Sequence, residues 1–214
     1  MTFVSPHLDD AVFSCGRAIA ANPGATIATV LAAAPSQEQP LTEWDRAAGF
    51  ATSRASVLSR QAEDARACEV LGARQALLRG LDGQYVRPAN HESLIAADLA
   101  RVLDGAAGAT FLPLGIGHED HILVARVARS VARALGLDVI FYEEIPYRVT
   151  GDKLAITRAY QAIAVEGWLV EAYPSPESEP GIKEAAIDCY ASQLGMFPRD
   201  VLLGSERYVR ARLA

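Results

Sequence analysis

Residues 110–142, TFLPLGIGHEDHILVARVARSVARALGLDVIFY, decide the fold of this chain. The apolar run Thr110–Leu114 is typical of a buried strand, and a turn, Gly115–Glu119, follows it. Asp120–Leu135 has the apolar spacing of a helix and is stopped by a glycine, after which Leu137–Tyr142 is a second apolar run. A strand, a helix and another strand in this order predict a parallel βαβ unit.

The same alternation of short apolar runs and longer amphipathic segments precedes this unit, interrupted by polar loops at 34–53 and 80–91. It favours an α/β fold: a Rossmann-like, doubly wound, mostly parallel sheet with helices on both faces and a C-terminal extension. Before this unit we expect three strands, at Thr2–Ser5, Ala25–Ala33 and Gln75–Arg79. We expect the helices between and after them at Asp9–Ala21, Ala55–Leu71 and Glu92–Leu103.

The last part of the chain has a weaker pattern. We expect one domain over 1–214, with a βαβ core at 1–143 and residues 144–214 as an extension of that domain. Within the extension we expect a strand at Arg158–Val165, a loop at Pro174–Pro180, a helix at Ile182–Leu194 and a strand at Glu206–Leu213.

The composition is that of an ordinary folded protein, because half of the 214 residues are hydrophobic, about a fifth are charged and the formal net charge is -6. An acidic chain without a basic run is a poor partner for nucleic acid. No stretch has 18 uncharged apolar residues, so we expect no membrane insertion, and polar residues from Ser5 onward are atypical of a signal peptide.

Cysteine usage indicates a reduced, cytoplasmic protein, because three cysteines without C-x-x-C spacing favour neither a disulfide framework nor a thiolate zinc site. Cys15 and Cys68 fall on helix faces and are expected to serve packing alone. His91, in a polar loop, is expected at the surface. Formation of a homo-oligomer is left open by the sequence.

Two short motifs contain three of the four histidines. In Pro6–Asp10 the chain leaves a strand and enters a helix, so His7 and Asp10, three apart on a tight turn, can face one centre. Gly115–His121 places two more imidazoles at another strand-to-helix junction. Imidazole and carboxylate are usual ligands of Zn(II), and a catalytic site needs three protein ligands with a position left for water. The pattern predicts a mononuclear metal site at the carboxyl ends of parallel strands.

Each motif has a simpler interpretation when taken alone. Asp9, Asp10 and Asp120 could cap helices or interact with helix dipoles. His118 and His121 could be exposed on a first helical turn. The two motifs together favour the metal site, because pattern and placement at strand ends are together far more specific than either alone.

Ser5–Gly16 and Gly117–Arg126 resemble the paired P-H-x-D-D and H-x-D-H motifs of the PIG-L, or LmbE-like, superfamily of metal-dependent N-acetylglucosaminyl deacetylases. The resemblance spans nearly the whole chain. Its supporting segments are Trp44-Asp45-Arg46, Gly49-Phe50, Arg60 with Glu63-Asp64, Leu71-Gly72, and Lys183 with Tyr190, Ser192 and Gln193.

The resemblance implies roles for six residues. His7, Asp10 and His121 would be the metal ligands, Asp9 the general base, and His118 the acid or oxyanion stabiliser, held as an imidazolium by the Asp120 carboxylate. Zn(II) is the expected metal and Fe(II) the alternative, because two histidines and a carboxylate also form the facial triad of non-haem iron proteins.

Other positions bear on the substrate. Arg46, Arg60 and Glu63 could hold substrate hydroxyls at the entrance, although helical Arg and Glu at this spacing also form solvated pairs. Glu119 stands where the family frequently has Pro. Ile116 stands where some of its deacetylases carry a tyrosine as an oxyanion donor, so we consider Tyr142 or Tyr147 as the replacement, with Tyr147 as a substrate-binding residue.

The expected function is removal of an N-acetyl group from a small amino-sugar substrate by metal-activated water, in the biosynthesis of a small molecule or natural product. Two alternatives stay open: a metal-dependent hydratase of an unsaturated carboxylic acid, and a non-catalytic binding protein with a vestigial metal site. A hydratase pocket would carry several cationic groups for the substrate carboxylates.

Overall fold

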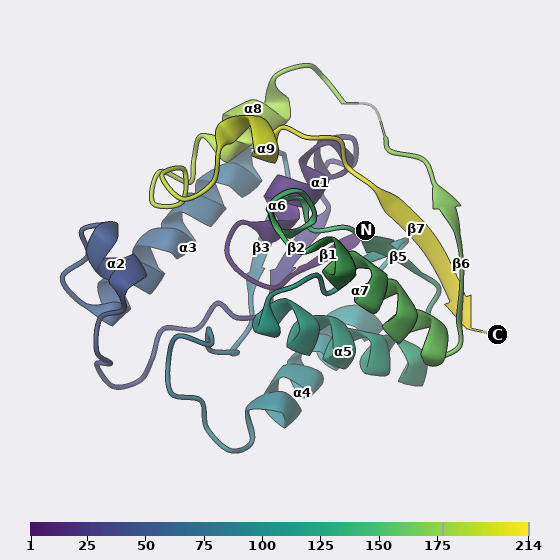
Figure 1. Cartoon of the computed structure of the whole chain (residues 1–214), viewed down its shortest axis with the longest axis horizontal. Coiled ribbons are helices and arrows are strands. Elements are labelled where there is room, and N and C mark those ends of the chain that lie inside the picture. The colour runs from purple at the N-terminus through teal and green to yellow at the C-terminus, as the bar shows by residue number, and fades with distance from the viewer. Residues whose placement is uncertain (177, 214) are drawn as a thin grey trace.

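One mixed sheet forms the centre of the molecule (Figure 1). The structure is a computed structural model that describes residues 1–176 and 178–213, with the backbone alone at residue 44. Its strands are β1 (Thr2–Ser5), β2 (Thr26–Thr29), β3 (Arg74–Leu77), β4 (Thr110–Pro113), β5 (Val139–Tyr142), β6 (Trp168–Tyr173) and β7 (Tyr208–Leu213). Across the sheet they lie in the order β3-β2-β1-β4-β5-β7-β6.

The strands β1 to β5 run parallel, whereas β7 pairs antiparallel with both β5 and β6. Helices cover both faces of this sheet. They are α1 (Asp10–Ala20), α2 (Glu43–Ala47), α3 (Ser53–Val70), α4 (His91–Asp104), α5 (Glu119–Ala134), α6 (Ile145–Thr150), α7 (Lys153–Val165), α8 (Ile182–Ile187) and α9 (Arg199–Leu202). The predicted doubly wound, mostly parallel α/β fold is confirmed.

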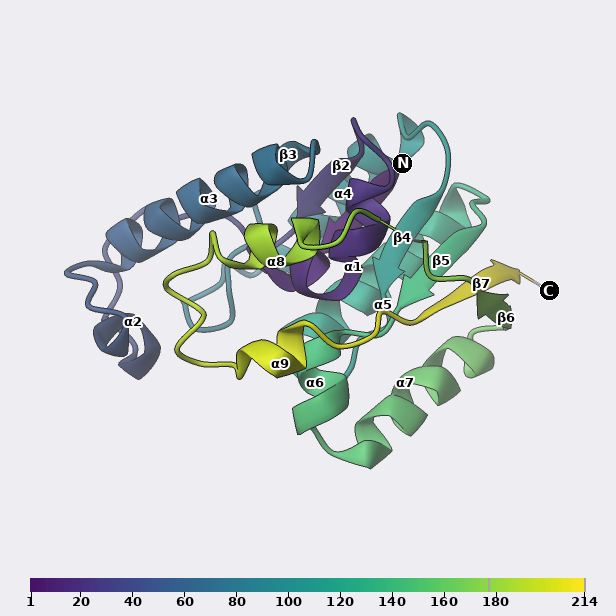
Figure 2. The ribbon, with the colours of Figure 1, turned by 90° about the horizontal axis from the view of Figure 1, so that it is seen from above.

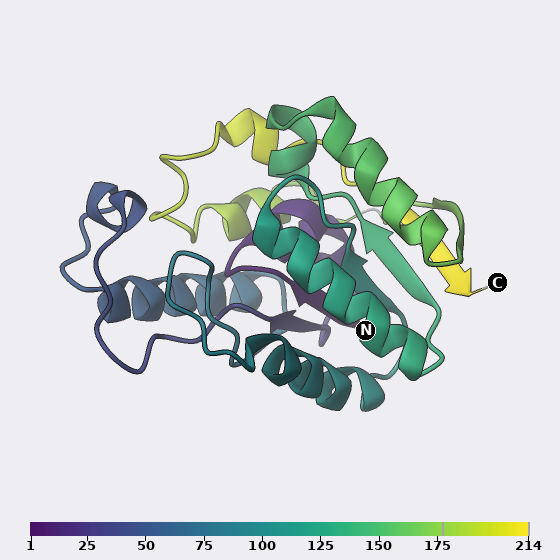
Figure 3. The same cartoon turned by 60° about the horizontal axis from the view of Figure 1, so that its bottom comes forward.

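The helices form two layers. α1, α3 and α8 lie on one face and α4, α5 and α7 on the other (Figures 1 and 3). Figure 2 shows α8 beside both α1 and α3, which it contacts, and α2 at the end of the molecule opposite β6 and β7. Helix α2 lies within residues 34–53, which were predicted as a loop.

Strand alternation divides the core between these layers. Phe3 and Phe111 are stacked in the layer of α1, whereas their neighbours Val4 and Leu112 belong to the layer of α5. All four side chains are buried. Neighbouring residues of a strand point to opposite faces, so strands covered on both sides have continuous apolar sequences.

The central strands β1 and β4 separate toward their carboxyl ends. The register joins them only at Thr2 and Phe3 with Thr110 and Phe111, whereas β1 with β2 and β4 with β5 are paired over four positions. The chain leaves β1 toward β2 and β4 toward β5, which makes this gap the topological switch point, where ligands of such folds bind. Both histidine motifs follow these two strands, as predicted.

The C-terminal part differs from the sequence prediction. Residues 158–165, predicted as a strand, belong to α7, because the buried Ala155, Ala159 and Ile163 are spaced four apart on one helical face. The predicted helix Ile182–Leu194 ends at Ile187. Strand β6 was not predicted, because most of its residues are exposed and no apolar alternation marks it.

Other predictions in this part have different outcomes. The predicted strand at the C-terminus is β7. Loop residues Pro174–Pro180 are irregular as predicted, except that Glu177 lies outside the described residues. Cys15 and Cys68 are buried, in agreement with a packing role. No helix among the described residues has the length and hydropathy needed to cross a bilayer.

The prediction of a surface position for His91 was wrong. His91 is the first residue of α4 and only 4% exposed, and its Nε2 accepts a hydrogen bond of 2.8 Å from the Leu81 N–H. The bond ties the 80–91 loop to α4. A buried backbone N–H needs such a partner, and the sequence alone does not show which side chain supplies it.

Gly115, two residues beyond the end of β4, tests how tightly the second motif is packed. Its φ is +91°, and a Cβ there would lie 2.8 Å from the Ala125 Cβ. Gly136 also has a positive φ, of +65°, but nothing lies within 4 Å of a Cβ placed there. We expect Gly115→Ala to lower the free energy of unfolding by about 2 to 4 kcal/mol, from backbone strain and overpacking together.

In the control Gly136→Ala only the backbone strain applies, so we expect the free energy of unfolding to fall by about 1 kcal/mol. Urea unfolding followed by circular dichroism measures both. Equal losses in the two variants would contradict the close packing of Gly115 against α5.

Candidate metal centre

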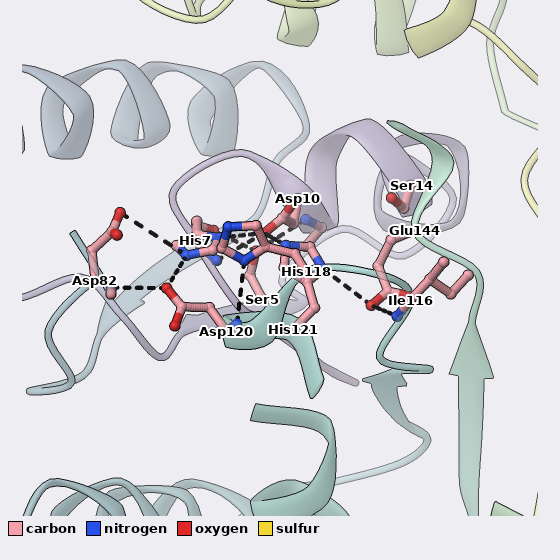
Figure 4. Close-up of polar contacts among 12 residues, drawn as sticks. Ser5, His7, Asp10, Ser14, Asp82, Ile116, His118, Asp120, His121 and Glu144 are labelled. Atoms are coloured by element: carbon pink, nitrogen blue, oxygen red, sulfur yellow. Dashed lines mark hydrogen bonds and ion pairs between the residues drawn. The ribbon is translucent and has the colours of Figure 1, made fainter. Parts of the chain in front are cut away.

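The Asp10 carboxylate lies at the centre of the cluster (Figure 4). Its Oδ2 is 3.2 Å from His7 Nδ1 and 3.1 Å from His121 Nε2, and it accepts a 2.9 Å hydrogen bond from the His7 backbone N–H. Asp10 and His121 are buried, and His7 is partly exposed. The structure thus brings the three predicted ligands together from the turn after β1, the start of α1 and the first turn of α5.

Local hydrogen bonds shape the first motif. Ser5 Oγ donates to the His7 carbonyl and accepts from the Ala11 N–H, so the turn after β1 is held before α1 begins. Ser5 is buried. The turn directs His7 and Asp10 toward the same point, which the spacing of three predicted.

The charges in the cluster are those of a centre that binds a cation. Although burial opposes both shifts, Asp10 and Glu144 raise the pKa of His121 to about 9, and His121 and His7 hold the pKa of Asp10 well below its usual range. A divalent ion would replace the protons that now compensate the carboxylate.

A metal ion fits this donor set. His121 Nε2 is buried and, within the described residues, makes no hydrogen bond of good geometry despite its proximity to Asp10. His7, Asp10 and His121 each offer a ligand atom, and these atoms lie within 4.8 Å of one another. Two imidazole nitrogens and a carboxylate oxygen beside a pocket form the usual open catalytic set.

A second group, His7, His118 and Asp120, has similar spacing but suits a cation less well. The Asp120 carboxylate pairs with the Arg87 guanidinium, and its Oδ2 accepts 2.8 Å and 3.0 Å hydrogen bonds from the Gly83 N–H and His7 Nε2. These partners lower the pKa of Asp120 despite its burial. A carboxylate that is already compensated has little left to offer a metal ion.

The position of Asp120 changes its expected role. The sequence-based expectation was that its carboxylate holds His118. Instead it contacts His7 Nε2, and the Asp120 backbone N–H donates to His118 Nδ1 at 3.2 Å, with His118 as the N-cap of α5. Burial lowers the pKa of His118, and the neighbouring His7 and His121 lower it further. The lowered pKa and the hydrogen bond accepted at Nδ1 both favour the neutral imidazole, with the ring proton on Nε2.

Asp9 lines the pocket beside the cluster without joining it. Its side chain does not cap α1, although it precedes that helix. Burial raises the pKa of its carboxyl to about 7, and the negative charge of Asp10 acts in the same direction. A carboxylate with a pKa near neutrality can accept and release a proton.

A pocket of about 660 Å³ opens over the cluster, within the usual range for small-molecule sites. Asp9 and His118 lie in its wall, and Asp82 and Gln84 come from the loop after β3. Gln193 and Phe197 close another side from the segment after α8. The pocket therefore combines the βαβ core with the C-terminal part.

The predicted substrate-binding residues separate into two groups. Arg60 and Tyr147 line the pocket. Arg46 is exposed and bonds the Leu41 carbonyl instead. Glu63 was wrongly placed at the entrance: it is buried, and both its oxygens accept hydrogen bonds from Ser192.

Arg60 and Glu63 do not form the solvated pair that was the alternative interpretation. Arg60 lies 3.5 Å from a carboxylate oxygen of Asp45, and two of its guanidinium nitrogens are buried without a hydrogen-bond partner in the described chain. The Arg60 guanidinium is therefore held inside the fold beside Asp45 rather than in solvent.

The two candidate tyrosines lie in different places. Tyr142 is buried and donates to the Val4 carbonyl, so it is removed from the pocket. Tyr147 lines the pocket, with its ring 4.4 Å from that of His121 and 5.7 Å from that of His118. Ile116 is buried outside the pocket lining.

Sequence reasoning missed three acidic or basic residues around the cluster, namely Asp82, Arg87 and Glu144. Asp82 Oδ2 is 4.0 Å from His7 Nε2, and Glu144 Oε1 is 3.1 Å from His121 Nδ1. Asp82 and Arg87 are in the loop after β3 and Glu144 follows Glu143 after β5, and none of them stands at a fixed spacing from a second ligand type. Only the fold places them beside the motifs.

The fold and this cluster define an α/β protein with a candidate metal site at the switch point of its sheet. The chain belongs to the PIG-L family, because the sequence model of that family, described as GlcNAc-PI de-N-acetylase, matches residues 2–132. The family resemblance seen in the motifs is thereby confirmed.

Individual proteins are also similar. The 2'-N-acetylparomamine deacetylase of Streptomyces fradiae is 30% identical over 174 residues, which cover 72% of this chain and 60% of that protein. A deacetylase of the teicoplanin biosynthesis pathway superposes with a TM-score of 0.76 at 21% identity, covering 98% of this chain and 96% of the other. A zinc-inhibited form of teicoplanin deacetylase superposes with a TM-score of 0.73 at 20% identity, covering 98% of this chain and 96% of the other. At these identities the structures show a shared fold.

The two histidines of the second motif should differ in metal binding. We expect His121→Ala to lose stoichiometric metal, because the variant lacks the buried Nε2 beside Asp10. We expect His118→Ala, a matched change in the same motif, to retain it, because the His118 side chain caps α5. Elemental analysis after loading with one equivalent of Zn(II) measures both. Metal retained by His121→Ala would show that His121 is not a ligand.

Proposed function

We propose that this protein is a metal-dependent hydrolase that removes an N-acyl group from a small amino-sugar-containing substrate. The observation that carries the proposal is the cluster of His7, Asp10 and His121 at a pocket that His7 and Asp10 line together with Asp9, which is not one of the three candidate ligands. The deacetylase relative from Streptomyces fradiae supports the same chemistry, although this chain spans 60% of its length.

The side chains of the pocket have separate tasks in this proposal. His7, Asp10 and His121 would hold the ion, which when bound lowers the pKa of water and polarises the amide carbonyl. Asp9 accepts the proton of the attacking water. It can then deliver that proton to the departing nitrogen, because the carboxyl lies in the pocket beside the ligands without being one of them.

In this proposal His118 stabilises the oxyanion as a neutral donor. Its Nδ1 accepts the hydrogen bond from the Asp120 N–H, so in the neutral ring the proton is on Nε2. An N–H donor held in place before the reaction stabilises negative charge that develops on the acyl oxygen. This arrangement replaces the imidazolium that the sequence suggested.

Zn(II) is the metal we propose first, with Fe(II) as the alternative. A hydrolytic reaction requires no redox chemistry, and two histidines with a carboxylate suit either ion. Because the similar teicoplanin deacetylase has a zinc-inhibited form, zinc is best added in measured equivalents. Parallel loading with Fe(II) under anaerobic conditions compares the two.

The hydratase alternative receives less support. Such an enzyme would need several cationic groups for substrate carboxylates, whereas Arg60 is the one Arg or Lys among the described residues that line the pocket. The lining instead includes Asp9, Asp82 and Glu119. This balance favours a neutral or cationic substrate.

The acidic lining further suggests a substrate with a second, protonated amino group. Glu119 is exposed in the first turn of α5, and the structure shows no ion pair for it within the described residues. Asp82 bonds Gln84 and approaches His7. An N-acetylated aminoglycoside precursor, as for the relative that acts on 2'-N-acetylparomamine, has this charge.

The reaction is tested by release of acetate and free amine from N-acetylglucosamine and from a mono-N-acetylated aminoglycoside. We expect Asp9→Asn to lower kcat roughly 10²- to 10⁴-fold, because the general base is lost, while the metal content stays at the wild-type level. Release measured by fluorescamine decides this. No release by the metal-loaded wild type from any such substrate would contradict the proposed reaction and favour a vestigial site.

Glu119→Gln tests the charge of the substrate. We expect KM for the cationic substrate to rise roughly two- to fivefold, the effect of one exposed ion pair, and KM for N-acetylglucosamine to stay unchanged. Glu92→Gln is a matched control, because Glu92 is in the first turn of α4, outside the pocket lining. An equal effect on both substrates would exclude charge recognition by Glu119.

A further inference from the structure

Glu144 is a buried carboxylate behind the metal cluster, on the side of His121 away from His7 (Figure 4). It follows β5 directly after Glu143 and is the N-cap residue of α6. Its Oε1 is 3.1 Å from His121 Nδ1 and accepts hydrogen bonds from the Gly115 and Ile116 backbone N–H groups, at 2.9 Å and 3.2 Å. One oxygen therefore meets both the ring and the turn that precedes it.

The surroundings of Glu144 provide no lysine or arginine partner among the described residues, and its Oε2 is buried without a hydrogen bond. A buried carboxylate is costly unless it is compensated. The groups that compensate it here are two backbone N–H groups and the imidazole of His121. The charge of Glu144 is thus directed at one side chain of the candidate metal centre.

A neutral glutamine could accept the two backbone hydrogen bonds equally well. These bonds hold the turn after β4, but they do not require a negative charge. The negative charge has its effect on the imidazole, because a carboxylate that accepts the Nδ1 proton fixes the tautomer and makes Nε2 a better electron-pair donor.

We propose that Glu144 is a positioning residue, which holds the proton of His121 on Nδ1 and so presents Nε2, beside Asp10 Oδ2, to a divalent cation. The inference rests on the metal centre proposed above and not on the reaction. Glu144 lies beyond the residues matched by the family model. It is reached through the fold, which places the end of β5 beside the start of α5.

Metal affinity tests this without any substrate. Zn(II) is titrated into metal-free protein in competition with a chromogenic chelator, for wild type, Glu144→Gln and Glu143→Gln. Glu143 is the matched control, because it is a buried neighbour whose carboxylate contacts Tyr160 and Arg148 rather than either motif. We expect Kd to rise roughly 10- to 100-fold in Glu144→Gln and to stay within about twofold in Glu143→Gln.

A spectroscopic signature separates positioning from a purely structural role. In zinc-loaded wild type, ¹⁵N NMR should show the His121 proton on Nδ1 with a hydrogen-bonded shift, which moves in Glu144→Gln and not in Glu143→Gln. The wild-type spectrum alone suffices if Glu144→Gln fails to fold. A proton on Nε2 would overturn the proposal.

The two levels of the proposal fail differently. If Glu144→Gln binds zinc with wild-type affinity but its metal-free form melts at a lower temperature, Glu144 only stabilises the turn after β4. That result would overturn its positioning role and leave the metal centre intact. No zinc binding by wild type would overturn the metal centre and the role of Glu144 with it.

Discussion

The structure depends on one carboxylate oxygen shared by two imidazoles. Asp10 Oδ2 lies between His7 and His121, and so links the end of β1 to the start of α5 where the sheet itself no longer joins them. Splayed strand ends leave room for a ligand, but they also leave buried polar groups that need compensation. Asp10, His7 and His121 therefore have two effects: their charges compensate one another where β1 and β4 separate, and they form the candidate metal site.

Much of the fold follows from the sequence, because the parallel core depends on apolar runs whose period and length are visible in it. Phe3 and Phe111 with their neighbours are apolar on both strand faces, and α5 carries one continuous apolar stripe. The C-terminal part is different. α7 buries mainly small residues such as Ala155 and Ala159, which also suit other structures, and β6 is an exposed edge whose position is set by pairing with β7.

The candidate site also has a part that the sequence predicts and a part that it does not. The approach of His7, Asp10 and His121 could be predicted, because short spacings at strand ends determine where side chains point. The residues that contact these motifs from elsewhere in the chain could not be predicted. Asp120 was expected to face His118, yet its carboxylate reaches toward Arg87, a residue whose position depends on a whole loop. Such partners lie close in space through the tertiary fold alone, which leaves no local pattern.

The segment between α8 and β7 is anchored at both ends and contributes to the pocket in between. Ser192 is bonded to the buried Glu63, and the Lys183 ammonium pairs with the buried Glu206, while Gln193 and Phe197 line the pocket. The portion between the anchors contributes none of the three candidate metal ligands. An exchange of this loop between relatives would therefore alter which molecules fit while leaving the hydrolytic apparatus in place, so evolution can diversify recognition and chemistry independently within one chain.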